Sequence, residues 1–116
     1  AATVARTSFT RPADTTQYTS GDLVANSVTA GSVVPIALVV GRVNGGTIIL
    51  RRMRLYKDSV SITNTSFRVH LFKSAPTVAN GDNGAWLTDK AANYLGFIDG
   101  AVMFAFADGC AQFGVW

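Results

Sequence analysis

The chain has 116 residues, of which 48% are hydrophobic and 15% are charged, and its formal net charge is +3. This length suits one domain with a modest core, and no apolar run approaches the roughly 20 residues of a membrane-spanning helix. Soluble domains carry about 25% charged residues, so this weakly charged chain favours an assembly protein over a lone monomer. Nucleic-acid-binding domains usually carry a larger, clustered positive charge. We therefore expect direct binding of neither nucleic acid nor membrane.

Residues 1–20 are rich in Ala, Thr and Ser and show no hydrophobic periodicity. A stretch of this kind cannot bury enough apolar surface to fold alone. We therefore expect an extended N-terminal arm that becomes ordered by docking, with Phe9 and Tyr18 as anchors. A first edge strand over residues 8–10 is the alternative. Residues 21–116 are expected to form the folded domain.

The most strand-like part of the chain is residues 33–57, in which two β-branched runs flank an Asn-Gly-Gly sequence at residues 44–46. Asn and Gly reach positive φ at low steric cost, so this pattern predicts a long β-hairpin. Both faces of its first strand are apolar, which indicates cover on both sides. On the second strand, alternation places Arg52 and Arg54 on one face and Met53 on the other. The apolar phase slips where the arginines begin, which favours a β-bulge.

Shorter strands are expected at residues 23–25, 67–73, 95–98 and 102–107, and residues 113–116 resemble the middle of another strand. Residues 67–73 show the cleanest alternation of apolar and polar side chains. One helical turn is expected over residues 89–94. At least six strands separated by Gly, Asn and Asp turns predict an all-β fold, an antiparallel β-sandwich or jelly-roll-like single domain. Because the sequence stops inside a strand pattern, we expect the C-terminal end to be incomplete.

Residue types that carry chemistry are sparse. The Asn-Gly-Asp-Asn-Gly loop at residues 80–84 offers oxygen ligands, but the chain has no Glu to complete a calcium loop. We therefore interpret this segment as a structural loop stabilised by Asn and Asp side chains. One histidine, His70, and one cysteine, Cys110, are too few for a zinc site. We expect His70 to be a satisfied sheet residue and Cys110 a small buried apolar residue.

Catalytic patterns are also missing from the sequence. It contains no Gly-x-Ser-x-Gly motif, and nothing brings two of its carboxylates together as glycoside cleavage requires. We expect no enzymatic activity, no catalytic residue, no cofactor and no bound metal.

Four segments carry a family resemblance: FTRPADTTQYTSGDLVANS at residues 9–27, RRMRLYK at 51–57, FRVHLFKSAPTVANGDNGAW at 67–86 and ANYLGFID at 92–99. Together they resemble small structural proteins of tailed bacteriophages, and the likeness spans most of the chain. The resemblance implies a virion protein without catalytic residues. Within that setting it implies a capsid decoration, or cement, protein that is made in the host cytoplasm. Such a protein binds the outside of the head and stabilises contacts between major capsid subunits.

On this resemblance, the expected partners are the major capsid protein and further copies of the chain, arranged as a closed homotrimer. The arm would add a strand to a neighbouring subunit. The residues expected to make these protein contacts are Phe9, Arg11, Asp14, Tyr18, Arg52 and Arg54. Two alternatives stay open: a tail or baseplate structural protein, and a carbohydrate-binding β-sandwich module that uses Trp86, Tyr94 and the loop at residues 80–84.

Overall fold

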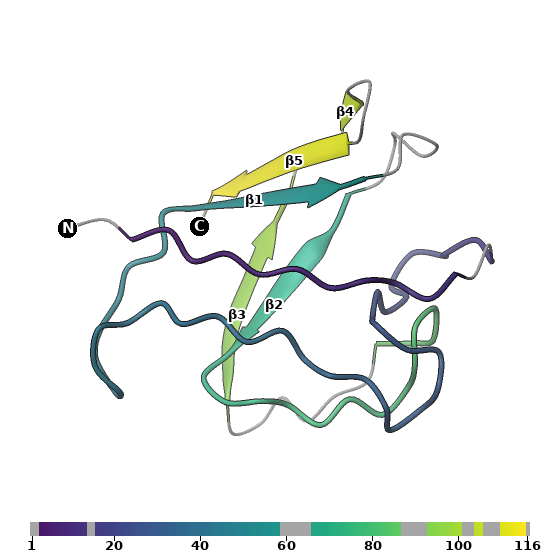
Figure 1. The fold of residues 1–116 in the computed structure, drawn as a ribbon, viewed down its shortest axis with the longest axis horizontal. Helices are drawn as coiled ribbons and strands as arrows, with labels where there is room; N and C mark the ends of the chain where they lie inside the picture. The colour runs from purple at the N-terminus through teal and green to yellow at the C-terminus, as the bar shows by residue number, and fades with distance from the viewer. Residues whose placement is uncertain are drawn as a thin grey trace. The chain divides into compact units, whose positions relative to one another are not determined.

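The computed structural model describes residues 3–13, 16–58, 66–86, 93–100, 104–105 and 110–115 (Figure 1). These residues contain five β-strands and no helix, so the prediction of a β protein is confirmed at this level. The chain divides into two compact units, Ala1–Gly46 with Ser74–Asn93 and Thr47–Lys73 with Tyr94–Trp116. All five strands lie in the second unit. No helix in the described part of the chain is long and apolar enough to cross a membrane.

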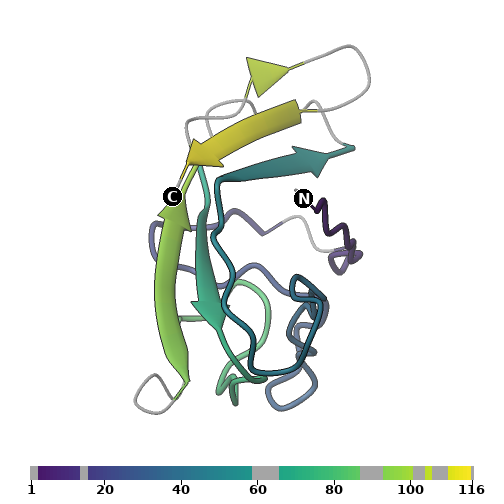
Figure 2. The ribbon, with the colours of Figure 1, turned by 90° about the vertical axis from the view of Figure 1, so that its left-hand side faces the viewer.

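A three-stranded antiparallel sheet has the order β1-β5-β4. It consists of β1 (Arg52–Lys57), β4 (Phe104–Ala105) and β5 (Cys110–Val115). Strand β1 pairs with β5 along its whole length, from Arg52 opposite Val115 to Lys57 opposite Cys110 (Figure 2). Along β1 the side chains alternate between exposed and half-buried, as the sequence pattern predicted.

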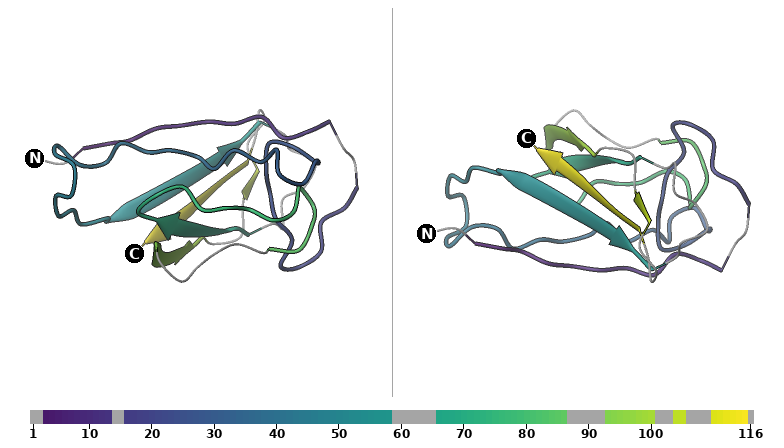
Figure 3. Two further views of the ribbon diagram at one scale, coloured as in Figure 1. Left: turned by 90° about the horizontal axis from the view of Figure 1, so that it is seen from below. Right: turned by 90° about the horizontal axis from the view of Figure 1, so that it is seen from above.

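A two-stranded antiparallel sheet pairs β2 (Arg68–Phe72) with β3 (Tyr94–Asp99) (Figure 3). Both strands were predicted from the sequence, within a residue or so of these bounds. The register runs from Arg68 opposite Asp99 and shifts between Leu71 and Phe72. Gly96, opposite Leu71, has a φ of +130°, a conformation that glycine adopts far more readily than other residues.

Gly114 lies where β5 closely approaches β3 and β1. A Cβ atom there would lie 2.7 Å from Ile98 Cγ2, 3.0 Å from the Asp99 carbonyl oxygen and 3.2 Å from Met53 Cε. A bridge also joins Gly114 to Gly100, and Ile98 is 4% exposed. A glycine in β5 therefore lets the backbone approach a buried side chain of β3.

The first unit is held together by loop contacts. Leu23 N donates to Gly84 O at 2.8 Å, and Asn83 N donates to Leu23 O at 2.8 Å. Leu23 and Ala25 are buried. The predicted strand over residues 23–25 is therefore wrong as a strand, because the chain pairs with a turn and makes only the isolated bridge from Asp22 to Ala85.

The predicted hairpin over residues 33–57 is confirmed in its turn and in the end of its second strand, and is wrong elsewhere. Gly46 N donates to Val43 O at 3.2 Å, and Gly45 has a φ of +75°. Residues 33–51 form no strand. A segment with high strand propensity forms a strand only when a neighbouring strand pairs with it. In the described chain, only residues 52–57 of this stretch have such a partner strand. Pro35 also lacks the N–H that a ladder uses.

Several predictions fall on residues outside the described ranges. Most of the helical turn expected at 89–94 does so, and Tyr94 itself begins β3. The strand expected at 102–107 is described only over Phe104–Ala105. Asp14 and the side chain of Cys110 also lie outside the described part.

Candidate interaction site

The first unit buries the Asp82 carboxylate, whose side chain has no exposed surface. Its Oδ1 accepts hydrogen bonds from the Tyr18 hydroxyl at 2.6 Å and from Ala25 N at 2.8 Å. Its Oδ2 accepts a hydrogen bond from Arg11 Nη2 at 3.3 Å. Burial of a charge is tolerated when it is paired and hydrogen-bonded, and Asp82 meets both conditions.

Arg11 and Tyr18 also contact each other. Arg11 Nε donates to the Tyr18 hydroxyl oxygen, and the guanidinium carbon lies 4.7 Å from the centre of the tyrosine ring. Burial and the hydrogen bond to Asp82 hold the pKa of Tyr18 above its ordinary value of 10.0. Tyr18 is thus a neutral donor to Asp82, while Arg11 supplies the positive charge. We name Arg11, Tyr18 and Asp82 the arm anchor.

The polar side chains of the loop at residues 80–84 form hydrogen bonds inside the first unit. Asn83 Nδ2 donates to Thr16 O at 3.2 Å, and Asn80 Nδ2 donates to Ala85 O at 2.9 Å. Asn83 also has a positive φ of 67°, which Asn tolerates better than most residues. These contacts support the interpretation of a structural loop. Among the residues that the structure describes, no group of three His, Cys, Asp or Glu could hold a metal ion.

The arm residues expected to touch a partner therefore have different surroundings. Arg11 and Tyr18 bind Asp82 of their own chain. Phe9 is 39% exposed and Val4 is 76% exposed, so the arm presents apolar side chains on either side of residues 5–8. Asp14 lies outside the described residues.

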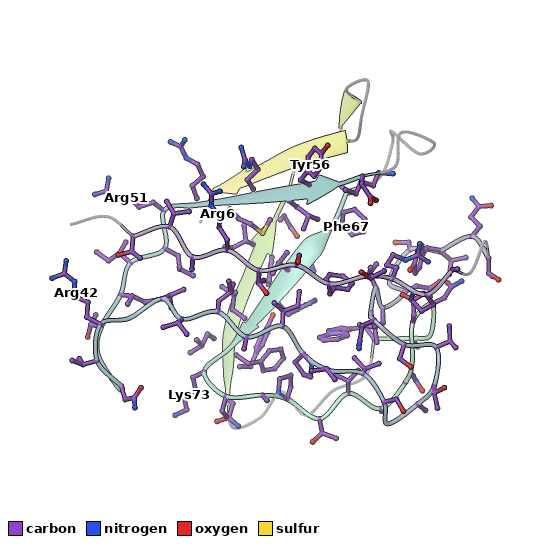
Figure 4. All side chains as sticks on the ribbon, in the orientation of Figure 1. Arg6, Arg42, Arg51, Tyr56, Phe67 and Lys73 are labelled. Carbon is purple, nitrogen blue, oxygen red and sulfur yellow. The ribbon has the colours of Figure 1, made fainter. Side chains whose placement is uncertain are left out.

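Arg52 and Arg54 lie on β1, in the other unit, and both are exposed. They share a face with Tyr56, which is 51% exposed. In Figure 4, Tyr56 is labelled on β1 and Arg51 projects from the chain just before this strand. In the described chain no ion pair joins Arg51, Arg52 or Arg54 to an acid.

Arg68 on β2 differs from this row because an acid lies directly opposite. Arg68 Nε donates to Asp99 Oδ1 at 2.7 Å and its Nη2 donates to Oδ2 at 3.1 Å. The guanidinium also lies 4.1 Å from the centre of the Phe97 ring. The hydrogen bond from Arg68 lowers the pKa of Asp99 below its ordinary value. Arg68 is therefore neutralised by its own sheet.

His70 occupies the middle of β2, as predicted, and its Nδ1 lies 3.0 Å from the Tyr94 hydroxyl oxygen. The His70 ring centre is 5.8 Å from that of Tyr94 and 6.2 Å from that of Phe97. The prediction that His70 is a satisfied sheet residue is confirmed.

An apolar depression of about 280 Å³ lies within the second unit. It is lined by Ile48, Ile49, Leu50, Leu71 and Leu95. Ile49 is 82% exposed and Leu95 is 58% exposed, so the depression opens to the surface of the unit. It can accept an apolar side chain and offers no charged group to a polar ligand.

The sequence did not reveal that Arg11 and Tyr18 bind Asp82, which lies 71 and 64 residues further along the chain. The available sequence signals were Asp82, an acid between two glycines of a short loop, and the N-terminal arm, which carries Arg11 and Tyr18. No protein-family model, curated protein or solved structure significantly matches the chain. The candidate sites therefore rest on their geometry.

Proposed function

We propose that the chain is a virion structural protein of a tailed bacteriophage, a capsid decoration protein that binds the outside of the head. The observation that carries this proposal is a band of exposed apolar side chains in the first unit. This apolar band consists of Val34, Ile36, Leu38, Val39, Val40 and Val43. Their exposed fractions run from 37% to 85%.

A band of this kind is costly in water. Burial of apolar surface is worth about 25 cal/mol per Å², and contiguous exposed apolar patches usually mark an interaction surface. The segment between Gly31 and Arg42 carries no charge that would keep it solvated. Association with another protein would bury it, and the family resemblance of the sequence points to a phage shell as that protein.

The proposal includes a mode of assembly. The sheets close into an antiparallel β-sandwich or jelly roll, and copies of the chain form a homotrimer at a symmetry site of the shell. Each copy then contacts neighbouring major capsid subunits. Many modest contacts, repeated over the shell, give strong overall attachment through effective concentration. Such attachment would hold adjacent subunits together against the pressure of packaged DNA.

The test uses particles of the phage that encodes the chain. Removal of the protein from purified particles should lower the temperature at which heads release DNA. Addition of the purified protein to stripped heads should restore that temperature and saturate at a fixed number of copies per head. Recovery of the protein exclusively in purified tails would contradict the proposal and favour a tail or baseplate component.

A further inference from the structure

We propose that the edge of β1 facing away from β5 binds an extended acidic segment of a partner protein, in which acidic residues alternate with apolar ones. This inference rests on the proposed function in one respect, namely that the partner is another virion subunit. The surface itself is defined by strand pairing and charge.

A row of arginines at the start of β1 forms no ion pair with any acid that the structure describes. Arg52 and Arg54 are exposed on β1, and Arg51 is exposed immediately before it. The β5 residues opposite the two strand arginines are Val115 and Phe113, which carry no charge. The row therefore has no acid opposite it in the strand pair that β1 makes within the described part of the chain.

The sheet of β2 and β3 pairs its exposed arginine with an acid. There, the arginine at the start of β2 has an acid as its cross-strand partner, since Arg68 lies opposite Asp99 and pairs with it at 2.7 Å. Opposite charges directly across a strand pair are stabilising. The same chain thus neutralises an exposed arginine within one sheet, whereas the two on β1 have no acidic cross-strand partner among the residues that the structure describes. An acidic strand from outside would supply the missing charges.

One edge of β1 has no strand paired with it among the described residues. In the described part of the chain, β1 pairs with β5 alone and stands at the end of the order β1-β5-β4. An end strand presents backbone groups that can pair with an added strand. Addition of an extended segment to such an edge is a recurrent mode of peptide recognition.

The two faces of β1 specify the pattern of the added segment. Arg52, Arg54 and Tyr56 lie on the exposed face, while Met53 and Leu55 are half-buried on the other. Cross-strand neighbours on one face have Cβ atoms about 4.5–5.5 Å apart. Asp or Glu at every second position would therefore meet the arginines, and apolar residues between them would extend the face of Met53 and Leu55.

Two other uses of the row are less favoured. Single-stranded nucleic acid would use the guanidinium groups but not the backbone edge, and the net charge of the chain is only +3. Charged residues on an end strand can also serve to prevent pairing. If the arginines only prevent strand pairing, they need no partner, and the acidic peptide should not bind.

The experiment measures binding of the full chain to an eight-residue peptide of alternating Asp and Val. The comparison ligands are a peptide of alternating Asn and Val, the acidic peptide with N-methylated alternate amides, and a single-stranded oligothymidylate. The variants are the double change Arg52→Glu with Arg54→Glu and the control double change Arg6→Glu with Arg42→Glu, which alters exposed arginines outside β1 by the same net charge. Circular dichroism checks that each variant is folded.

The acidic peptide should bind, and the β1 double variant should bind it at least about tenfold more weakly, because two attractive pairs become repulsive. The control variant should lose much less, and the Asn peptide and the N-methylated peptide should bind weakly. Equal losses in both double variants would indicate bulk charge and overturn the proposal. Binding of neither acidic nor neutral peptide, or tighter β1-dependent binding of the oligothymidylate, would also overturn it.

Failure of the β1 site and failure of the proposed function give different experimental results. If the peptide binds at β1 but the chain does not bind phage heads, the site stands and the capsid decoration role fails. If the chain binds heads and the β1 double variant binds them equally well, the role stands and this site is wrong.

Discussion

The Tyr18 hydroxyl donates a 2.6 Å hydrogen bond to the buried Asp82 carboxylate, across 64 residues of sequence. This contact, with that of Arg11, holds two residues of the arm against the loop at residues 80–84. The arm is thus ordered by its own chain at one point, while Val4 and Phe9 remain exposed. An arm held at one end suits a segment that completes its contacts in an assembly.

Asp82→Asn should destabilise the protein by about 2–4 kcal/mol, because it removes a buried, multiply hydrogen-bonded charge and leaves Arg11 unpaired. Urea denaturation followed by fluorescence measures the change. Asp58→Asn, at an exposed acid, should change the free energy of unfolding by less than about 0.5 kcal/mol. Equal effects of the two substitutions would show that the arm anchor contributes nothing to stability.

The raised pKa of Tyr18 gives the arm anchor a defined pH dependence. Since the folded pKa exceeds the unfolded value of 10.0, the contribution of Tyr18 is fully present below pH 10 and is lost as the pH rises through the folded value. The stability difference between wild type and Tyr18→Phe should therefore shrink above pH 10. Ultraviolet difference titration should assign to Tyr18 an ionisation above its ordinary value, and an ionisation at the ordinary value would contradict the geometry of the anchor.

Gly81→Ala should cost about 3 kcal/mol of stability, because the new Cβ would lie 2.2 Å from Val28 O and 2.4 Å from Val28 C, both backbone atoms. The matched control is Gly31→Ala. Gly31 has open space around it but a φ of +81°, so its substitution should cost about 1 kcal/mol from backbone strain alone. Thermal unfolding should rank Gly81→Ala as the less stable variant. The reverse order would show that Gly81 does not pack closely against the backbone of Val28.

Val39→Asp and Ile36→Asp should leave the isolated protein folded but abolish its attachment to phage heads. Val39 is 85% exposed and Ile36 is 50% exposed, so neither change buries a charge in the monomer, whereas both would do so at an interface. Ser32→Asp, at an exposed polar residue of the same segment, is the control and should still attach. Sedimentation of heads with the added variant measures binding. Normal attachment of Val39→Asp would show that the apolar band does not contact the head.

Asp99 should titrate below its ordinary pKa because of its hydrogen bonds from Arg68. The stabilising effect of this pair is present above the unfolded pKa of 3.8 and is lost as the pH falls through the lower folded value. In Arg68→Gln the pKa of Asp99 should rise toward 3.8, as followed by carboxyl carbon shifts in NMR. An unchanged value would mean that the Arg68–Asp99 pair does not persist in solution.

The strands that were predicted correctly from the sequence are those that pair with another strand of the described chain. Residues 67–73 alternate cleanly, and residues 95–98 form a short apolar run that ends at an Asp-Gly turn. They appear as β2 and β3 because each pairs with the other. The turn at residues 44–46 was also evident, since Asn and Gly favour its backbone geometry. Alternation likewise gave the correct faces for Arg52, Arg54 and Met53 on β1.

Residues 33–41 show what a sequence pattern cannot supply. Their composition favours a strand, but a strand also needs a ladder partner, and in the described chain this segment has none. The arm anchor was missed for a similar reason. Arg11 and Tyr18 find Asp82 only after the fold has brought the arm and the loop at residues 80–84 together, and no local pattern encodes that approach.

A low-resolution electron cryo-microscopy map of the phage particle, compared with one of particles stripped of the protein, tests the central claim most directly. Extra density in the native particle should lie on the outer surface of the head, at the junctions between major capsid subunits. Extra density confined to the tail or baseplate, or heads that are identical in the two maps, would contradict a capsid decoration protein.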